Sequence, residues 1–248
     1  MRSAHSRGSR SRMVFGLLAI TVVGGLTATS LVALNQAGAV TARGADCADV
    51  HVITARASTE RPGEGVTAAL VSRIVNTSDQ TVSRAPVDYP ATLTNYANSA
   101  GRGVAALTTQ LTEQVQECPD QKIVLAGYSQ GAHVVLDVLG GGGGGVLGRA
   151  TAPIDASIGS HVTAVATFGD PRHVVGQPFD AGTATRDGRF PRSAAQLRVL
   201  AGFADRIQTF CDSGDTFCAS GASTVVHLTY MNRYRDDATD FVLGKVGG

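Results

Sequence analysis

The sequence predicts an α/β fold: a three-layer sandwich whose central, mainly parallel sheet of about five strands carries helices on both faces. Two observations lead to this prediction. Short β-branched and apolar runs, such as residues 50–55 and 122–126, alternate with amphipathic segments at helical spacing, such as residues 99–116. The composition also stays even from about residue 40 to residue 248, which indicates one domain.

The individual elements follow from the same periodicities and from the glycines and prolines that bound them. The expected strands cover residues 50–55, 81–87, 122–126 and 161–168, and the short apolar segments 197–200 and 207–210 supply at least one more. The expected helices cover residues 66–74, 99–116, 132–139 and 236–246. The glycine run 140–145 predicts a flexible loop, and residues 172–195, rich in Gly, Pro and Arg, predict a surface loop.

The first 39 residues have the layout of a secretory signal peptide. An arginine-rich start precedes residues 14–34, which carry no charge, and Ala37-Gly38-Ala39 fits the small-x-small rule of signal peptidase. An uncleaved membrane anchor is the alternative, because the uncharged stretch is long enough to span a bilayer. The small-residue site favours cleavage near Ala39, so we expect a secreted, extracellular protein whose mature domain covers residues 40–248.

Charge and cysteine content narrow the class further. The formal net charge is +1 and the arginines are scattered, which predicts a solvated surface and no nucleic-acid partner. The four cysteines allow three pairings. Outside the cytoplasm they predict disulfides rather than a zinc site, and no Cys-x-x-Cys is present, so we expect no metal or other cofactor. We expect the pairs Cys47–Cys118 and Cys211–Cys218.

The sequence Gly127-Tyr128-Ser129-Gln130-Gly131 lies between the expected strand 122–126 and the expected helix 132–139. Gly-x-Ser-x-Gly in this setting predicts a nucleophile elbow, in which a sharp turn holds the serine hydroxyl above the sheet edge. Side chains at positions 127 or 131 would collide with the neighbouring strand and helix. Ser129 is therefore the expected nucleophile.

A serine nucleophile needs a base, and the base follows the acid in the chain order of this fold. Four histidines lie beyond Ser129. His133 falls inside the elbow helix, and His161 opens a strand at the wrong end of the sheet. His173 remains possible in the loop after Gly169-Asp170-Pro171. His227 comes last in the chain and is the predicted base.

Position alone leaves three candidates for the acid that orients the base. Asp205 follows the segment 197–200, which the apolar run predicts to be a strand, whereas Asp212 and Asp215 lie between Cys211 and Cys218. A small disulfide loop would hold a carboxylate rigidly beside an imidazole, as orientation of the base requires.

Several blocks in the same order make the chain resemble the cutinase family of serine esterases, with the α/β-hydrolase fold, over nearly all of residues 47–246. The matching blocks are residues 55–60 (Ala-Arg-Ala-Ser-Thr-Glu), 89–93 (Tyr-Pro-Ala-Thr-Leu), 127–131, 168–171 (Phe-Gly-Asp-Pro), 211–218 (Cys-Asp-Ser-Gly-Asp-Thr-Phe-Cys) and 227–230 (His-Leu-Thr-Tyr).

The resemblance implies a triad of Ser129, Asp215 and His227 and the two disulfides paired as above. It also implies an oxyanion hole from the backbone N–H groups of Ser58 and Gln130, assisted by the Ser58 hydroxyl. The chain departs from the family pattern at Ala57, where glycine is usual, and in the glycine run 140–145. Residues 221–226, before the predicted base, are also smaller and more polar at first than the bulky aliphatics common there.

These features predict a secreted serine carboxylesterase that acts on short to medium acyl esters, cutin-like polyester or lipid. A carbohydrate deacetylase of the acetylxylan type is the alternative, and a non-catalytic secreted binding protein is a third hypothesis that the intact triad argues against. The expected partner is an ester substrate, on a polyester, lipid or acylated polysaccharide surface, and the expected state is a monomer. Because residues 221–224 offer little apolar surface, we predict a preference for acyl chains of about two to six carbons.

Overall fold

The computed structural model describes residues 47–247, so the expected signal peptide and its cleavage site near Ala39 lie outside the described residues. In that part of the chain, six parallel strands form one sheet in the order β2-β1-β3-β4-β6-β5. The strands are β1 (Val50–Ala55), β2 (Val82–Pro86), β3 (Lys122–Tyr128), β4 (Val162–Phe168), β5 (Asp180–Ala181) and β6 (Ile207–Phe210). The predicted parallel α/β architecture is confirmed, with one strand more than the expected five.

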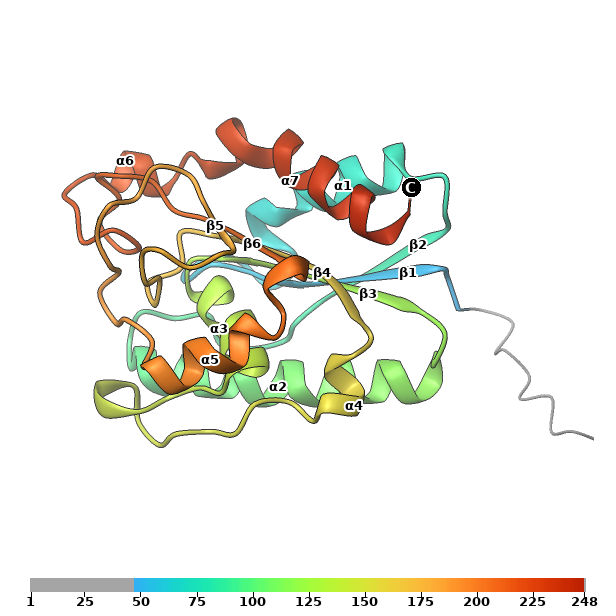
Figure 1. The fold of residues 1–248 in the computed structure, drawn as a ribbon, viewed down its shortest axis with the longest axis horizontal. Helices are drawn as coiled ribbons and strands as arrows, with labels where there is room; N and C mark the ends of the chain where they lie inside the picture. Colours follow the sequence, from blue (N-terminus) through green and yellow to red (C-terminus); the bar gives the residue numbers. More distant parts are fainter. Residues whose placement is uncertain (1–46, 248) are drawn as a thin grey trace, which may run out of the picture. The chain divides into compact units, whose positions relative to one another are not determined.

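Helices cover both faces of the sheet (Figure 1). The α-helices are α1 (Ala68–Thr77), α2 (Tyr96–Glu117), α3 (Gln130–Gly140), α4 (Ala156–Gly159), α5 (Ala194–Ala201), α6 (Thr224–His227) and α7 (Tyr230–Val246). Three short 3-10 helices complete the set: η1 (Gly65–Thr67), η2 (Gly145–Leu147) and η3 (Ala204–Arg206). Helices α1 and α7 cover one face, and α2, α3 and α5 cover the other (Figure 1).

The core is divided by the sheet into two apolar layers because successive side chains of a strand point to opposite faces. In β3, Ile123 and Leu125 pack with α2 and α3, through residues such as Leu107. Val124 of the same strand packs on the other side, with residues such as Leu70. Strands buried on both faces read as continuous apolar runs, which is why β1 and β3 were visible in the sequence.

The segment 197–200 is not a strand but belongs to α5. A capping box starts this helix: the Ser193 hydroxyl accepts from the N–H of Gln196, and the Gln196 side chain accepts from the N–H of Ser193. That Ser-x-x-Gln signal outweighs the short apolar run, of which Leu200 alone is fully buried. The expectation of at least one strand in this region is met by β6.

The glycine run is more ordered than the predicted flexible loop. Gly140 is the last residue of α3, and Gly142 pairs with Thr151 in an antiparallel bridge. A Cβ at position 143, where φ is +65°, would lie 2.1 Å from the carbonyl oxygen of Arg149. The run therefore forms one arm of a tight loop whose two arms approach too closely for a side chain.

Both disulfides join the expected cysteines. Cys47 is bonded to Cys118, 71 residues away, and Cys211 is bonded to Cys218, seven residues away. No helix within residues 47–247 combines the length and apolar character needed to cross a bilayer.

The two disulfides are expected to differ in their contribution to stability, because the chain entropy that a cross-link removes grows with the loop it closes. Replacing Cys47 and Cys118 by serine should lower the free energy of unfolding by about 4 kcal/mol, against about 2 kcal/mol for Cys211 and Cys218. Denaturant unfolding of the two double variants and the wild type measures both values. Equal losses in the two variants would contradict the loop-length argument.

Candidate active site

Ser129 lies at the junction of β3 and α3, at the carboxyl edge of the sheet. Its backbone has φ of 54° and ψ of −114°, a conformation that a residue with a side chain rarely adopts. The close approach of α3 to β1 enforces this turn, since a Cβ at position 131 would lie 1.9 Å from the carbonyl oxygen of Ala55. A Cβ at position 127 would lie 2.6 Å from the Gly131 carbonyl oxygen. The steric requirement predicted for both glycines is thus visible in the backbone.

Side chains from three separate segments form a continuous series of hydrogen-bond contacts. His227 Nε2 lies 2.9 Å from Ser129 Oγ, and His227 Nδ1 lies 2.8 Å from Asp215 Oδ2. A carboxylate only accepts, so Nδ1 carries the proton and Nε2 is left to accept from the serine hydroxyl. The imidazole is 5% exposed and Asp215 is fully buried. This geometry gives Ser129 a base within hydrogen-bond reach and gives that base an orienting partner.

The carboxylate of Asp215 is held at both oxygens. Oδ2 also accepts from the Tyr230 hydroxyl at 2.8 Å, and Oδ1 accepts from the N–H groups of Phe217 at 2.6 Å and Cys218 at 3.0 Å. Burial acts to raise the pKa of Asp215, but the hydrogen bond and charge of His227 and these two N–H groups outweigh it and lower the pKa. The small disulfide loop therefore delivers an ionised, oriented carboxylate to His227.

The other two acid candidates lie elsewhere. Asp205 is exposed in η3. Asp212 accepts from the Tyr234 hydroxyl at 2.7 Å and forms an ion pair with Arg233 at 2.8 Å, so it ties the disulfide loop to α7. The structure brings only Asp215 of these three to His227.

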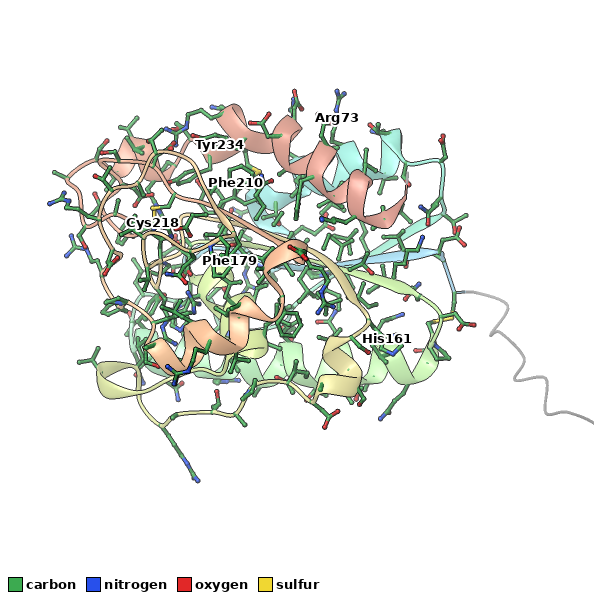
Figure 2. All side chains as sticks on the ribbon, viewed as in Figure 1. Arg73, His161, Phe179, Phe210, Cys218 and Tyr234 are labelled. Carbon is green, nitrogen blue, oxygen red and sulfur yellow. A yellow bond between two sulfur atoms is a disulfide. The ribbon has the colours of Figure 1, made fainter. Side chains whose placement is uncertain are left out.

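None of the other three histidines beyond Ser129 makes a side-chain contact with it in the described part of the chain. His161 precedes β4, and Figure 2 shows it at the opposite end of the sheet from Cys218. His173 is buried, with Nδ1 3.6 Å from Asp180. His133 lies within α3, where it contacts Asp137 and Tyr96.

The two expected oxyanion donors flank Ser129. Gln130 is the first residue of α3, so its backbone N–H has no partner in the preceding turn of helix. Its side chain is anchored, with Oε1 accepting from Ser99 Oγ at 3.2 Å. Ser58 follows β1, and its hydroxyl oxygen is buried with no hydrogen-bond partner among the described residues. A buried, unpartnered hydroxyl beside the nucleophile is suited to a charge that appears only during reaction.

No group of His, Cys, Asp and Glu within residues 47–247 is arranged as metal ligands would be.

Comparison with known proteins gives the site a family context. The family model described as Cutinase matches residues 46–246. The chain belongs to the cutinase family. The resemblance inferred from the six sequence blocks is confirmed.

Proteins similar to this family member include cutinases and acetylxylan esterases. Cutinase 11 of Verticillium dahliae is 34% identical over 209 residues, covering 81% of this chain and 70% of that protein. The acetylxylan esterase of Hypocrea jecorina is 34% identical over 205 residues, covering 79% and 67%. The solved catalytic core domain of an acetyl xylan esterase from Trichoderma reesei has a TM-score of 0.75 at 32% identity, covering 81% of this chain and all of that one. The chain is a carboxylic ester hydrolase with an α/β-hydrolase fold.

In this cutinase-family chain, Ser129 and His227 line a pocket of about 370 Å³. Its wall is apolar and largely aromatic, and consists mainly of Leu93, Tyr96, Phe190, Phe217 and Leu228. The Phe217 ring lies 4.5 Å from the imidazole of His227 and shields it from solvent. The size and lining suit a small to medium apolar acyl group.

The predicted preference for short acyl chains rested on the wrong residues, because residues 221–224 do not line this pocket. They brace the loop that carries Asp215: the N–H of Gly221 donates to the Asp215 carbonyl oxygen at 2.7 Å, and Ser223 caps α6. The loop 172–195 supplies wall instead, through Arg189 and Phe190.

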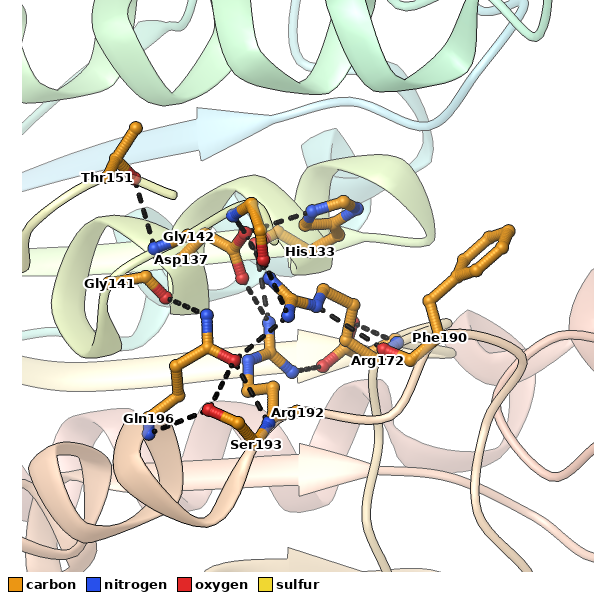
Figure 3. A network of polar contacts seen from close by, with 12 residues as sticks. His133, Asp137, Gly141, Gly142, Thr151, Arg172, Phe190, Arg192, Ser193 and Gln196 are labelled. Atoms are coloured by element: carbon orange, nitrogen blue, oxygen red, sulfur yellow. Dashed lines mark hydrogen bonds and ion pairs between the residues drawn. The ribbon is translucent and has the colours of Figure 1, made fainter. Parts of the chain in front are cut away.

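A buried ionic network lies between α3 and the loop after β4 (Figure 3). Asp137 Oδ2 accepts from His133 Nε2 at 3.0 Å and from Arg172 Nη1 at 2.5 Å, and Oδ1 accepts from Arg192 Nη2 at 3.1 Å. Arg192 also pairs with the buried Asp170. Both arginines of this network are buried, and so is Arg56, although the sequence assigned the arginines to a solvated surface.

This network supports the pocket wall. Arg172 Nε donates to the Phe190 carbonyl oxygen at 3.3 Å, and the Tyr96 hydroxyl lies 2.9 Å from His133 Nδ1. The rings of Tyr96 and Phe190 stack with centroids 5.7 Å apart. Sequence patterns gave no signal for this arrangement, because each charge is acceptable inside the protein only through partners distant in the chain.

The electrostatics of Asp137 follow from the same contacts. Burial acts to raise its pKa, but His133, Arg192 and Arg172 outweigh burial and hold the pKa well below the ordinary value. The carboxylate is charged in the folded protein, and both arginines depend on it.

Asp137→Asn should lower the free energy of unfolding by about 3–5 kcal/mol near neutral pH, because it leaves the buried arginines short of negative charge. In the wild type, the stability that this carboxylate provides is fully present above the unfolded pKa of about 3.9. This stability is lost as the pH falls further, towards the pKa of Asp137 in the folded protein, since the unfolded chain then binds the proton more readily. The Asp137→Asn variant should therefore not show this loss of stability at acid pH. Denaturant unfolding at a series of pH values measures both effects.

Asp240→Asn provides the control, because Asp240 is an exposed carboxylate on α7. We expect this variant to follow the wild-type curve. An Asp137→Asn protein as stable as the wild type, with the same acid limb, would show that the network contributes nothing to stability.

Proposed function

We propose that the chain is a secreted serine esterase that hydrolyses carboxylic esters through an acyl-enzyme on Ser129. The observation that carries this proposal is the line of contacts from Ser129 Oγ to His227 and on to Asp215, at 2.9 and 2.8 Å. Residues 40–248 form its catalytic domain, and residues 1–39 direct export and are cleaved. Two disulfides support an oxidising compartment. A monomer is sufficient, since one chain supplies every residue of the site.

The first half of the reaction forms the acyl-enzyme. His227 Nε2 removes the proton from Ser129 as Oγ attacks the ester carbonyl carbon, and Asp215 stabilises the resulting imidazolium. The carbonyl oxygen becomes an oxyanion, which accepts from the backbone N–H groups of Ser58 and Gln130 and from the Ser58 hydroxyl. The tetrahedral intermediate then collapses as His227 gives its proton to the departing alcohol.

The second half reverses these roles. Water enters the position of the alcohol, His227 takes one of its protons, and the hydroxyl oxygen attacks the acyl carbon. Collapse of the second tetrahedral intermediate releases the carboxylic acid and returns the proton to Ser129. A single lost oxyanion donor costs about 10²–10³ in kcat in comparable sites, so Ser58 and Gln130 account for several kcal/mol of transition-state stabilisation.

The substrates we propose are esters of short to medium acyl chains, including cutin-like polyester and lipid. Deacetylation of a carbohydrate of the acetylxylan type is the second candidate, supported by the similarity to acetylxylan esterases in sequence and in structure. The apolar, aromatic pocket wall favours the first candidate, because an acetyl group would leave most of the 370 Å³ unfilled.

Labelling by an organophosphonate tests the proposed nucleophile. The folded wild-type protein should take up one phosphonate per chain, on Ser129, and lose its esterase activity in step, because the phosphonate mimics the tetrahedral intermediate. Ser129→Ala should not be labelled and should have no activity above background, with an unchanged unfolding curve. Peptide mapping identifies the modified residue. Activity of the alanine variant within tenfold of the wild type would overturn the mechanism.

The assignment of the acid can be tested separately. Asp215→Asn should lower kcat by about 10⁴, the cost of the corresponding change in the serine-protease template, because the amide no longer fixes the imidazole tautomer. Asp205→Asn, at an exposed carboxylate, is the matched control and should retain full activity. The two rates are measured with a nitrophenyl butanoate ester, and the opposite ranking would transfer the role to Asp205.

A further inference from the structure

A second cavity, of about 700 Å³, lies next to the pocket of Ser129. Arg189 and Phe190 line both cavities, so these two residues form the boundary at which the cavities adjoin. We call this second cavity the glycine groove, because the glycine run 140–145 forms one bank and the exposed side of α5 forms the other. The groove is therefore next to the reacting centre, within reach of an extended substrate whose ester lies at Ser129.

The glycine run holds this bank in place without filling the groove. Gln196 Nε2 donates to the Gly141 carbonyl oxygen at 2.9 Å (Figure 3). Arg172 Nη2 donates to the Gly143 carbonyl oxygen at 3.3 Å. A Cβ at position 144 would meet nothing within 4 Å, so this glycine faces open space. The buried network therefore fixes the base of the loop, and Gly144 and Gly145 add no side chain to the open space beside it.

Except for the exposed Arg189, of which only Nε has a partner among the described residues, the Thr216 carbonyl oxygen at 2.9 Å, the polar side chains that line the groove are engaged within the protein. Gln196 Oε1 accepts from Arg172 Nη2 and from the N–H of Ser193, both at 3.0 Å. The Arg172 guanidinium also donates to Asp137, and the Ser193 hydroxyl caps α5. A sugar would need several such groups free to replace its hydrogen bonds to water, and among the described residues of this lining Arg189 alone offers unpaired donors.

The remaining surface is apolar. Val146, which is 80% exposed, stands at the tip of the glycine loop, and Val199, which is 38% exposed, lies on α5. Leu147, Ala150, Pro153, Pro191 and Ala195 add apolar surface, and no carboxylate side chain is among the described residues that line the groove. An aliphatic chain gains by covering this surface, at roughly 0.8 kcal/mol for each buried methylene.

We propose that the pocket of Ser129 holds the short to medium part of the chain next to the ester and that the glycine groove binds its aliphatic continuation. Long-chain esters are then favoured over short ones, in place of the preference for about two to six carbons that residues 221–224 predicted. This inference rests on the proposed function and adds a substrate class to it. Phe190 marks the boundary between the reacting centre and the groove, and the glycine run is the feature that opens the second cavity.

Val199→Glu tests the groove, because it places a negative charge against the aliphatic chain of the substrate. The position is exposed on α5, so the protein itself should tolerate the charge. The rates are measured with nitrophenyl esters from butanoate to dodecanoate and with acetate esters of short and long alcohols, all below their micellar concentrations. In the wild type, kcat/KM should rise with chain length in at least one series. In the variant, the long-to-short ratio should fall about tenfold, equivalent to two buried methylenes.

Two further variants make the outcome decisive. Val75→Glu is the matched control, since Val75 is also 38% exposed but lies on α1, and it should leave every rate unchanged. Ala195→Trp, also on the exposed side of α5, fills the groove and should lower the same ratio.

The proposal is overturned if the wild type shows no gain in kcat/KM with chain length in either series. It is also overturned if both groove variants keep the wild-type long-to-short ratio, or if they lose activity on acetylated xylan while keeping it on long aliphatic esters. Failure of the proposed function is distinct from these results, because it would show as absent hydrolysis of the butanoate ester by the wild type.

Discussion

The strained turn at Ser129 is the constraint on which the rest of the site depends. A residue with a side chain adopts φ of 54° and ψ of −114° only when its surroundings leave no alternative. Here β3 and α3 are fixed by two apolar layers, and the helix starts so close to β1 that position 131 has no room for a Cβ. The packing of the whole sandwich thus offsets the cost of one local conformation, which places Oγ above the sheet edge.

Because the sheet is parallel, every loop that follows a strand emerges at that same edge. Ser58 follows β1, Ser129 follows β3, Asp170 follows β4, and Asp215 follows β6. These loops are held in different ways. A disulfide and two backbone N–H groups fix Asp215, whereas a buried ionic network fixes the loop after β4. Asp215 and the part of the substrate wall formed by Tyr96 and Phe190 therefore rest on separate supports, whereas Phe217 contributes both to the wall and to the hold on Asp215.

The buried network has a cost as well as a function. Four charged side chains and His133 give up water, and their mutual contacts must compensate for that loss. What the protein gains is a defined position for Tyr96 and Phe190 on one side and for the glycine run on the other. The reaction pocket and the glycine groove thus share one internal anchor, centred on Asp137.

The sequence by itself determined the parallel α/β fold, the elbow, and the residues that meet at Ser129. These features depend on local patterns: buried apolar strands, a Gly-x-Ser-x-Gly turn, and the chain order of serine, acid and histidine. Position alone left Asp205, Asp212 and Asp215 open, and the family resemblance singled out Asp215. Only the tertiary structure decided which residues face the substrate. Residues 221–224 are next to His227 in sequence yet brace a loop, whereas Leu93, Tyr96 and Phe190 converge from distant segments. The burial of Arg172 and Arg192 was equally invisible, because a charge is stable in the interior only beside partners that folding brings to it.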